Sequence, residues 1–196
     1  MTAGPTSGTT AAPERRPADP TVKTEAEIVP LARRGFVGPA LAARYPVERV
    51  VDPSLLSALA LWRDVAPSGV LVRAERSLER VLTDPRLNSA RATVIQMIGP
   101  DPLDWPIVYH GWGFADWRAG KRPPAYRVGG LPWPALARAT ADSYADVLAA
   151  KAPVVHRLSM FGPDMAVIYD RVAFPSSRVP GGEVDTLLTV SASGRT

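Results

Sequence analysis

The chain has 196 residues, no cysteine, and 23 lysine and arginine side chains against 19 aspartates and glutamates. A chain without cysteine has no disulfide scaffold, thiolate metal site or cysteine nucleophile. Its arginines are scattered along the sequence, whereas nucleic-acid-binding proteins gather them on one face, so nucleic acid is not an expected partner. No stretch approaches the roughly 18 apolar residues that span a bilayer, and the N-terminus lacks the apolar segment of a secretory signal. The expected location is the cytoplasm, without membrane contact.

The first half of the chain is expected to hold a tail, an arm and two helices. Residues 1–26 are rich in Thr, Ala, Pro and Gly and predict a disordered tail. Residues 27–91 predict an N-terminal arm and helices, with 28–51 forming an arm or one short helix because prolines interrupt its apolar clusters. Asp52 and Pro53 are a helix-start signal, and apolar residues then recur at helical spacing as far as Trp62. A second helix is expected within 72–85.

The second half, residues 92–196, predicts a sheet domain. Short segments at 91–99 and 105–113 have the composition of strands, and 133–151 carries one long apolar stripe at helical spacing. Three alternating segments then follow in 154–192, joined by turn sequences that contain glycine and proline. The expected fold is α+β, with one antiparallel sheet of about five strands, helices on one face, and an N-terminal helical extension.

Three short motifs add to this order of elements: LALWRD at 59–64, YDRVAFP at 169–175 and VDTLLTVS at 184–191. Together they resemble the PAS-like family, in particular the divergent single-domain PAS-type proteins common in alphaproteobacteria. The resemblance covers about residues 53–192. It implies a PAS-like sheet with helices on one face.

The resemblance also implies a stand-alone sensory or regulatory module that acts by ligand sensing or protein contact. Such a module has no chemistry of its own unless a cofactor supplies it, and its partner would be a second copy of itself or a separate signalling protein. The sequence contains no nucleophile elbow, zinc-protease motif or phosphate loop, so no catalytic or metal-binding residue is predicted. The alternative is a small-molecule enzyme or carrier that uses the same α+β pocket.

The candidate ligand-binding residues are Trp112, Tyr126, Tyr144 and His156. Aromatic side chains crowd residues 105–126, and such side chains either line pockets or fill the core. His156 is the expected polar contact, while both His156 and His110 lie on predicted strands, which favours structural histidines over haem ligands. Asp142 and Asp146 are expected on the solvated face of the long helix. Neither a cofactor nor a ligand is identified.

Overall fold

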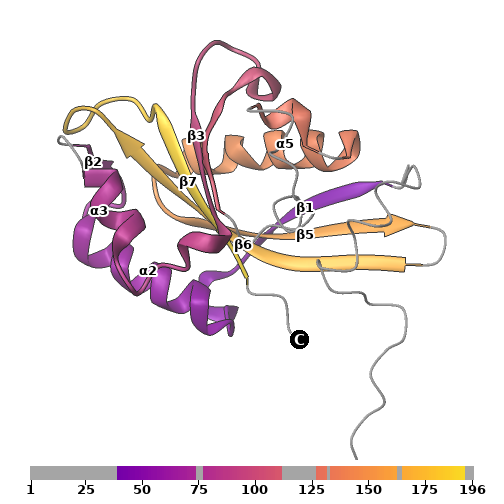
Figure 1. Ribbon diagram of the computed structural model, residues 1–196, viewed down its shortest axis with the longest axis horizontal. Coiled ribbons are helices and arrows are strands. Elements are labelled where there is room, and N and C mark those ends of the chain that lie inside the picture. The colour runs from indigo at the N-terminus through magenta and orange to yellow at the C-terminus, as the bar shows by residue number, and fades with distance from the viewer. Residues whose placement is uncertain (1–38, 74–76, 112–126, 132, 163–164, 193–196) are drawn as a thin grey trace, which may run out of the picture.

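The computed structural model describes residues 39–73, 77–111, 127–131, 133–162 and 165–192 (Figure 1). These residues form an α+β fold, as predicted. Its α-helices are α2 (Pro53–Val65), α3 (Ser77–Thr83) and α5 (Pro134–Ala150). Its strands are β1 (Ala40–Tyr45), β2 (Leu71–Val72), β3 (Ala92–Gln96), β4 (Ile107–His110), β5 (Val154–Gly162), β6 (Met165–Ser177) and β7 (Thr186–Ser191). The tail expected at 1–26 lies outside the described residues.

All the strands belong to one seven-stranded sheet, in the order β1-β5-β6-β7-β3-β4. Every pair on this path is antiparallel, and β2 pairs in parallel with β6. The prediction that the two strands before the long helix share a sheet with the three after it is therefore confirmed. The predicted number of about five strands was too low, because β1 forms within a segment expected to be an arm or helix and β2 was not anticipated.

The ends of α2 and α5 follow from local sequence signals. Asp52 Oδ1 accepts hydrogen bonds from the backbone N–H groups of Ser54 and Leu55, which satisfies two donors of the first turn of α2. α5 begins at Pro134, where the missing N–H has no intrahelical acceptor to lose. It ends at Ala150, and the next residue, Lys151, has a left-handed φ of 46° that breaks the helix.

The helices lie on both faces of the sheet, which corrects the expectation that they cover one face. Val172 and Phe174 of β6 belong to a buried cluster with α2, whereas Ala173 between them packs in a second cluster with α5. Since successive strand side chains point to opposite faces, α2 and α5 must cover opposite faces. Figure 1 shows α5 separated from α2 and α3 by the strands of the sheet. The central strands are therefore buried on both faces.

Trp62 is the largest fully buried side chain on the α2 face. Its ring stacks on Phe174 of β6 with 4.6 Å between centroids, and its Nε1–H donates to the carbonyl of Gly69 over 3.0 Å. Trp62 therefore ties α2 both to the sheet and to the loop that leads into β2. Among the described residues no helix is long and apolar enough to cross a membrane.

Candidate functional site

Six polar or aromatic residues gather between α5 and the sheet, next to the buried apolar side chains that α5 covers. α5 contributes four of them and the sheet two. We call them the Arg171 cluster: Thr140, Ser143, Tyr144, Asp146, His156 and Arg171. His156 of β5 and Arg171 of β6 are directly opposite each other in the antiparallel ladder, so their side chains leave the sheet on the same face.

Arg171 is a buried cation without a carboxylate partner in the described part of the chain. It is 5% exposed. Its Nη2 donates to the Ser143 hydroxyl over 2.6 Å, and its Nη1 lies 3.4 Å from the Thr140 hydroxyl. The guanidinium carbon lies 5.4 Å from the centre of the Tyr144 ring, which adds a cation–π contact. Its Nε has no hydrogen-bond acceptor among the residues that the structure describes. Hydroxyl groups and a ring face compensate a buried charge only in part.

His156 is completely buried beside this cation. Its Nε2 lies 2.9 Å from Oδ2 of Asp146, while its Nδ1 has no hydrogen-bond partner in the described ranges of the chain. Burial lowers the pKa of His156; the hydrogen bond that the ring makes to Asp146 opposes this shift, and the positive charge of Arg171 adds to it. The ring is therefore neutral near pH 7, with Nε2–H donating to Asp146 and Nδ1 left as an acceptor.

Asp146 is the link between the cluster and the protein surface. The sequence placed it on the solvated face of the long helix, and its side chain is indeed 47% exposed. Its carboxylate nevertheless reaches His156 beneath α5, a contact that the sequence does not indicate. Asp142, one turn earlier, is exposed as expected.

Tyr144 lies at the edge of the cluster that is nearest to β3 and β4. It is 2% exposed, and its ring lies nearly parallel to that of Trp105, with 6.0 Å between centroids and 16° between planes. Burial raises the pKa of its phenol, and the neighbouring Arg171 opposes the shift. Two of the four candidate residues, Tyr144 and His156, thus lie in the same cluster. The other two, Trp112 and Tyr126, lie outside the described residues.

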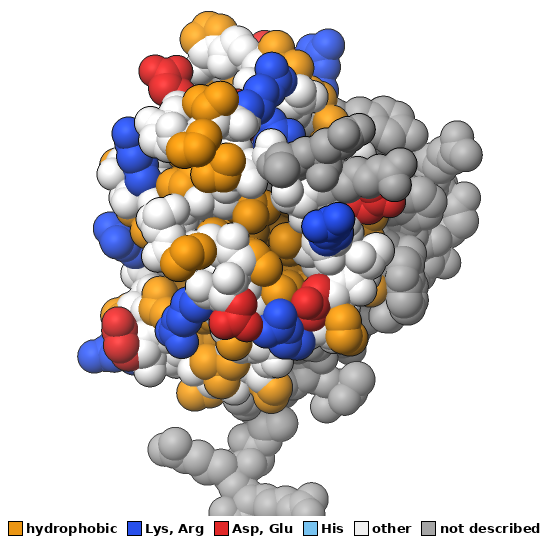
Figure 2. All heavy atoms as spheres, turned by 90° about the vertical axis from the view of Figure 1, so that its left-hand side faces the viewer, with side chains coloured by type: hydrophobic (Ala, Val, Ile, Leu, Met, Phe, Trp, Pro, Cys, Tyr) orange, Lys and Arg blue, Asp and Glu red, His pale blue; other side chains and the backbone are white. Residues whose placement is uncertain are grey.

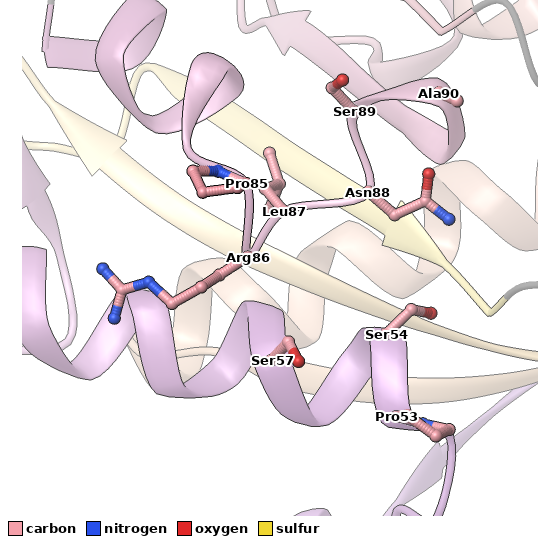
Figure 3. Close-up of a pocket in the computed structure, with 9 residues that line it drawn as sticks. All are labelled: Pro53, Ser54, Ser57, Pro85, Arg86, Leu87, Asn88, Ser89 and Ala90. Carbon is pink, nitrogen blue, oxygen red and sulfur yellow. The ribbon is translucent and has the colours of Figure 1, made fainter.

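A shallow surface groove of about 520 Å³ lies on the opposite side of the sheet (Figure 3). Ser54 and Ser57 on the first turns of α2 face the loop at 85–90 across it. Arg86, the one charged side chain in its lining, forms ion pairs with Asp64 and Asp84. Figure 2 shows that basic and acidic side chains are interspersed with hydrophobic ones on the molecular side that contains α2 and α3. The groove presents no unpaired charge to a ligand.

The described residues contain no group of three or more His, Asp or Glu side chains that could hold a metal ion. His110, the other histidine, lies in β4 with its Nδ1 3.2 Å from the hydroxyl of Thr93. Burial lowers the pKa of His110 to about 4. Both histidines are therefore held neutral by the fold, as structural histidines are.

We expect the folded state to lose stability as the pH falls from 6.5 towards 4. The pKa of His110 is lower in the folded chain than its ordinary value of 6.5, so the unfolded chain binds the proton more readily in this window. The contribution is complete above pH 6.5 and disappears on acidification, with a slope of at most about 1.4 kcal/mol per pH unit for one histidine. Urea unfolding at several pH values between 5 and 7.5 measures this slope.

The matched control for this measurement is His110→Gln, which keeps a hydrogen-bonding group opposite Thr93 but does not titrate. Its slope between pH 5 and 7.5 should be shallower than that of the unmodified chain. The remaining slope then includes His156, whose pKa shifts in the same direction. An unchanged slope in His110→Gln would show that His110 is not desolvated in solution.

Comparison with known proteins leaves the family open. No protein-family model matches the chain, and no curated protein or solved structure is detectably similar to it.

Proposed function

We propose that this chain is a PAS-like sensory or regulatory module that acts by ligand sensing or protein contact and has no intrinsic catalytic activity. The observation that carries the proposal is the order of the five predicted strands, which is β4-β3-β7-β6-β5. In a PAS sheet, likewise, the first strand lies between the second and the last, and the last three strands form a meander. α5 occupies the connection between β4 and β5 and packs across one face, where a PAS domain has its long helix.

The Arg171 cluster gives this module a polar centre between α5 and the sheet, where a PAS-type ligand would sit. The PAS-like frame also carries additions: β1 and β2 extend the sheet, and α2 with α3 covers the face opposite α5. A ligand between α5 and the sheet would change the position of α5. The opposite face of the sheet would stay covered by α2 and α3. The proposed output is therefore a displacement of α5, read by a second copy of the chain or by a separate signalling protein.

The alternative function, a small-molecule enzyme or carrier, has one observation in its favour. The Asp146–His156 pair and Ser143 belong to the same cluster, as in hydrolases that use a serine nucleophile. However, the Ser143 hydroxyl donates to the Thr140 carbonyl over 2.7 Å and accepts from Arg171. Because this hydroxyl does not bond to His156, the arrangement favours binding over nucleophilic catalysis.

Native mass spectrometry of the protein purified from cells that naturally make it tests the proposal. We expect a retained small molecule, a homodimer, or a complex with a signalling partner. A monomer without ligand in every preparation would contradict it. Chemical conversion of the retained molecule over time would favour the enzyme instead.

A further inference from the structure

The Arg171 cluster contains two buried atoms with unused and opposite hydrogen-bonding capacity. Among the described residues, Nε of Arg171 is a charged donor without an acceptor, and Nδ1 of the neutral His156 ring is an acceptor without a donor. The two residues are cross-strand partners, so their Cβ atoms lie about 5 Å apart on one face of the sheet. Buried polar groups without partners are uncommon in native proteins, and one donor and one acceptor on neighbouring side chains suggest a ligand that offers both.

The uncompensated charge of Arg171 also indicates a ligand. Arg157, on β5 and on the opposite face of the sheet, has an ordinary arrangement: its Nε and Nη2 donate to the two carboxylate oxygens of Asp170 over 2.8 and 3.1 Å. Arg171 is far more buried and has no such carboxylate among the described residues. The carboxylate that reaches this cluster, that of Asp146, is hydrogen-bonded to His156. The fold thus supplies a carboxylate to the half-exposed arginine but not to the buried one.

From these contacts we infer that the Arg171 cluster binds a small 2-hydroxycarboxylate. This inference rests on the proposed function as a ligand-sensing module and names its ligand class. The ligand carboxylate accepts a hydrogen bond from Nε of Arg171 and neutralises its charge, as carboxylates do for guanidinium groups. The ligand hydroxyl donates to Nδ1 of His156. Asp146 is a positioning residue, because its bond to Nε2 fixes the tautomer in which Nδ1 accepts.

Binding at this place couples the ligand to α5. The cluster is buried except at Asp146, so a molecule enters only when α5 moves away from β5 and β6. The Ser143 hydroxyl, which now bonds to Arg171, moves with the helix. The ligand shifts the population towards this displaced state because it forms hydrogen bonds with Nε of Arg171 and Nδ1 of His156, which have no partners in the closed state of the described residues.

The test is a titration of the full chain with matched acids, followed by thermal unfolding and calorimetry. Glycolate and lactate carry the hydroxyl, whereas acetate and propionate lack it. We expect saturable stabilisation by glycolate or lactate. Acetate and propionate should bind about tenfold more weakly, which corresponds to the loss of one buried hydrogen bond. Sulfate and inorganic phosphate are the control anions.

Three variants assign the effect to residues. Arg171→Met should abolish the response to all four acids, and the variant should still fold, since replacing a buried charge by an apolar side chain of similar length is often tolerated. His156→Phe should remove the preference for glycolate over acetate. Arg157→Gln is the matched control: it removes an arginine of the same strand pair on the other face and should keep the full response.

Several results would overturn the inference. One is the absence of any saturable response to the acids at millimolar concentrations, and another is an equal response in Arg171→Met. Stronger binding of sulfate or phosphate would exclude a carboxylate site, and equal binding of acetate and glycolate would exclude the hydroxyl contact. If Arg171→Met does not fold, a crystal structure of the wild-type chain with lactate decides: lactate on Arg171 supports the site, and lactate elsewhere or absent contradicts it. A neutral ligand found by native mass spectrometry would refute this inference and leave the proposed function standing.

Discussion

Trp62→Ala should lower the free energy of unfolding by about 3–5 kcal/mol, as expected for the truncation of a large buried ring. Trp62 is 1% exposed and fills the space between α2 and β6, where its ring stacks on Phe174. The alanine variant also leaves the Gly69 carbonyl without the indole N–H that donates to it. Urea unfolding followed by circular dichroism measures the loss as a lower midpoint with an unchanged slope.

Two further variants separate the causes of this effect. Trp62→Phe keeps an aromatic ring against Phe174 and loses the hydrogen bond to Gly69, so it should cost about 1–3 kcal/mol. Leu56→Ala, on the exposed side of the same helix, should change stability by less than about 0.5 kcal/mol. If Trp62→Ala were no more destabilising than Leu56→Ala, α2 would not pack on the sheet as described.

Local signals in the sequence predict the helices well. Asp52 and Pro53 are the cap and first residue of α2, as expected from side-chain capping and the fixed φ of proline. The apolar stripe predicted for the long helix is buried from Leu136 to Val147. One of the predicted turns that contain glycine and proline is Pro180-Gly181-Gly182, which lies between β6 and β7, with Gly181 at a φ of 67°. Each of these features depends on neighbours within a few residues, which the sequence displays directly.

The two unpredicted strands depend on distant partners instead. β1 has the sequence ALAARY, which lacks the β-branched residues and the alternation that identify a strand. It forms because its backbone pairs with β5 along the full length of β1, in a register that brings Ala40 opposite Met160. β2 has only two residues, too few for a periodic pattern.

The distribution of helices over the two faces was predictable in principle. All six residues of β7, from Thr186 to Ser191, are buried, and so are the residues of β6 from Arg171 to Ser177. A strand that is buried on both faces has apolar residues at odd and even positions alike. Leu187 and Leu188 show this pattern in the sequence, although helices were expected on only one face of the sheet.

The sequence indicated part of the candidate site. His156 was a candidate residue, and by strand alternation it shares a face with Val154 and Leu158, which are buried as it is. Arg171 was missed, although it lies within the YDRVAFP motif, because an arginine in a strand is most often at the surface. Arg171 comes one residue before the buried Val172, so its side chain points to the opposite face of the sheet. Only the packing of α5 shows that this face is covered as well.

Tyr144→Ala should also destabilise the chain by about 3–5 kcal/mol, whether or not a ligand binds. The ring of Tyr144 stacks on Trp105 and lies over the guanidinium of Arg171, so its removal opens a cavity beside a buried charge. This variant therefore tests packing and does not separate a core residue from a ligand-binding one. Thermal or urea unfolding measures the loss.

Tyr144→Phe distinguishes a core residue from a ligand-lining one. It keeps the ring stacked on Trp105 and over Arg171 and removes only the hydroxyl. A ligand-lining role predicts nearly unchanged stability with weaker retention of the molecule that copurifies. Tyr109→Phe is the matched control: its hydroxyl donates to the Ser89 carbonyl over 3.0 Å, and its ring packs in the cluster on the α2 face. It should cost about 1 kcal/mol for the lost hydrogen bond and leave ligand retention unchanged. Equal retention of the copurifying molecule in Tyr144→Phe and Tyr109→Phe would show that Tyr144 fills the core without lining a site. Any contact between α5 and that molecule would then come from other side chains.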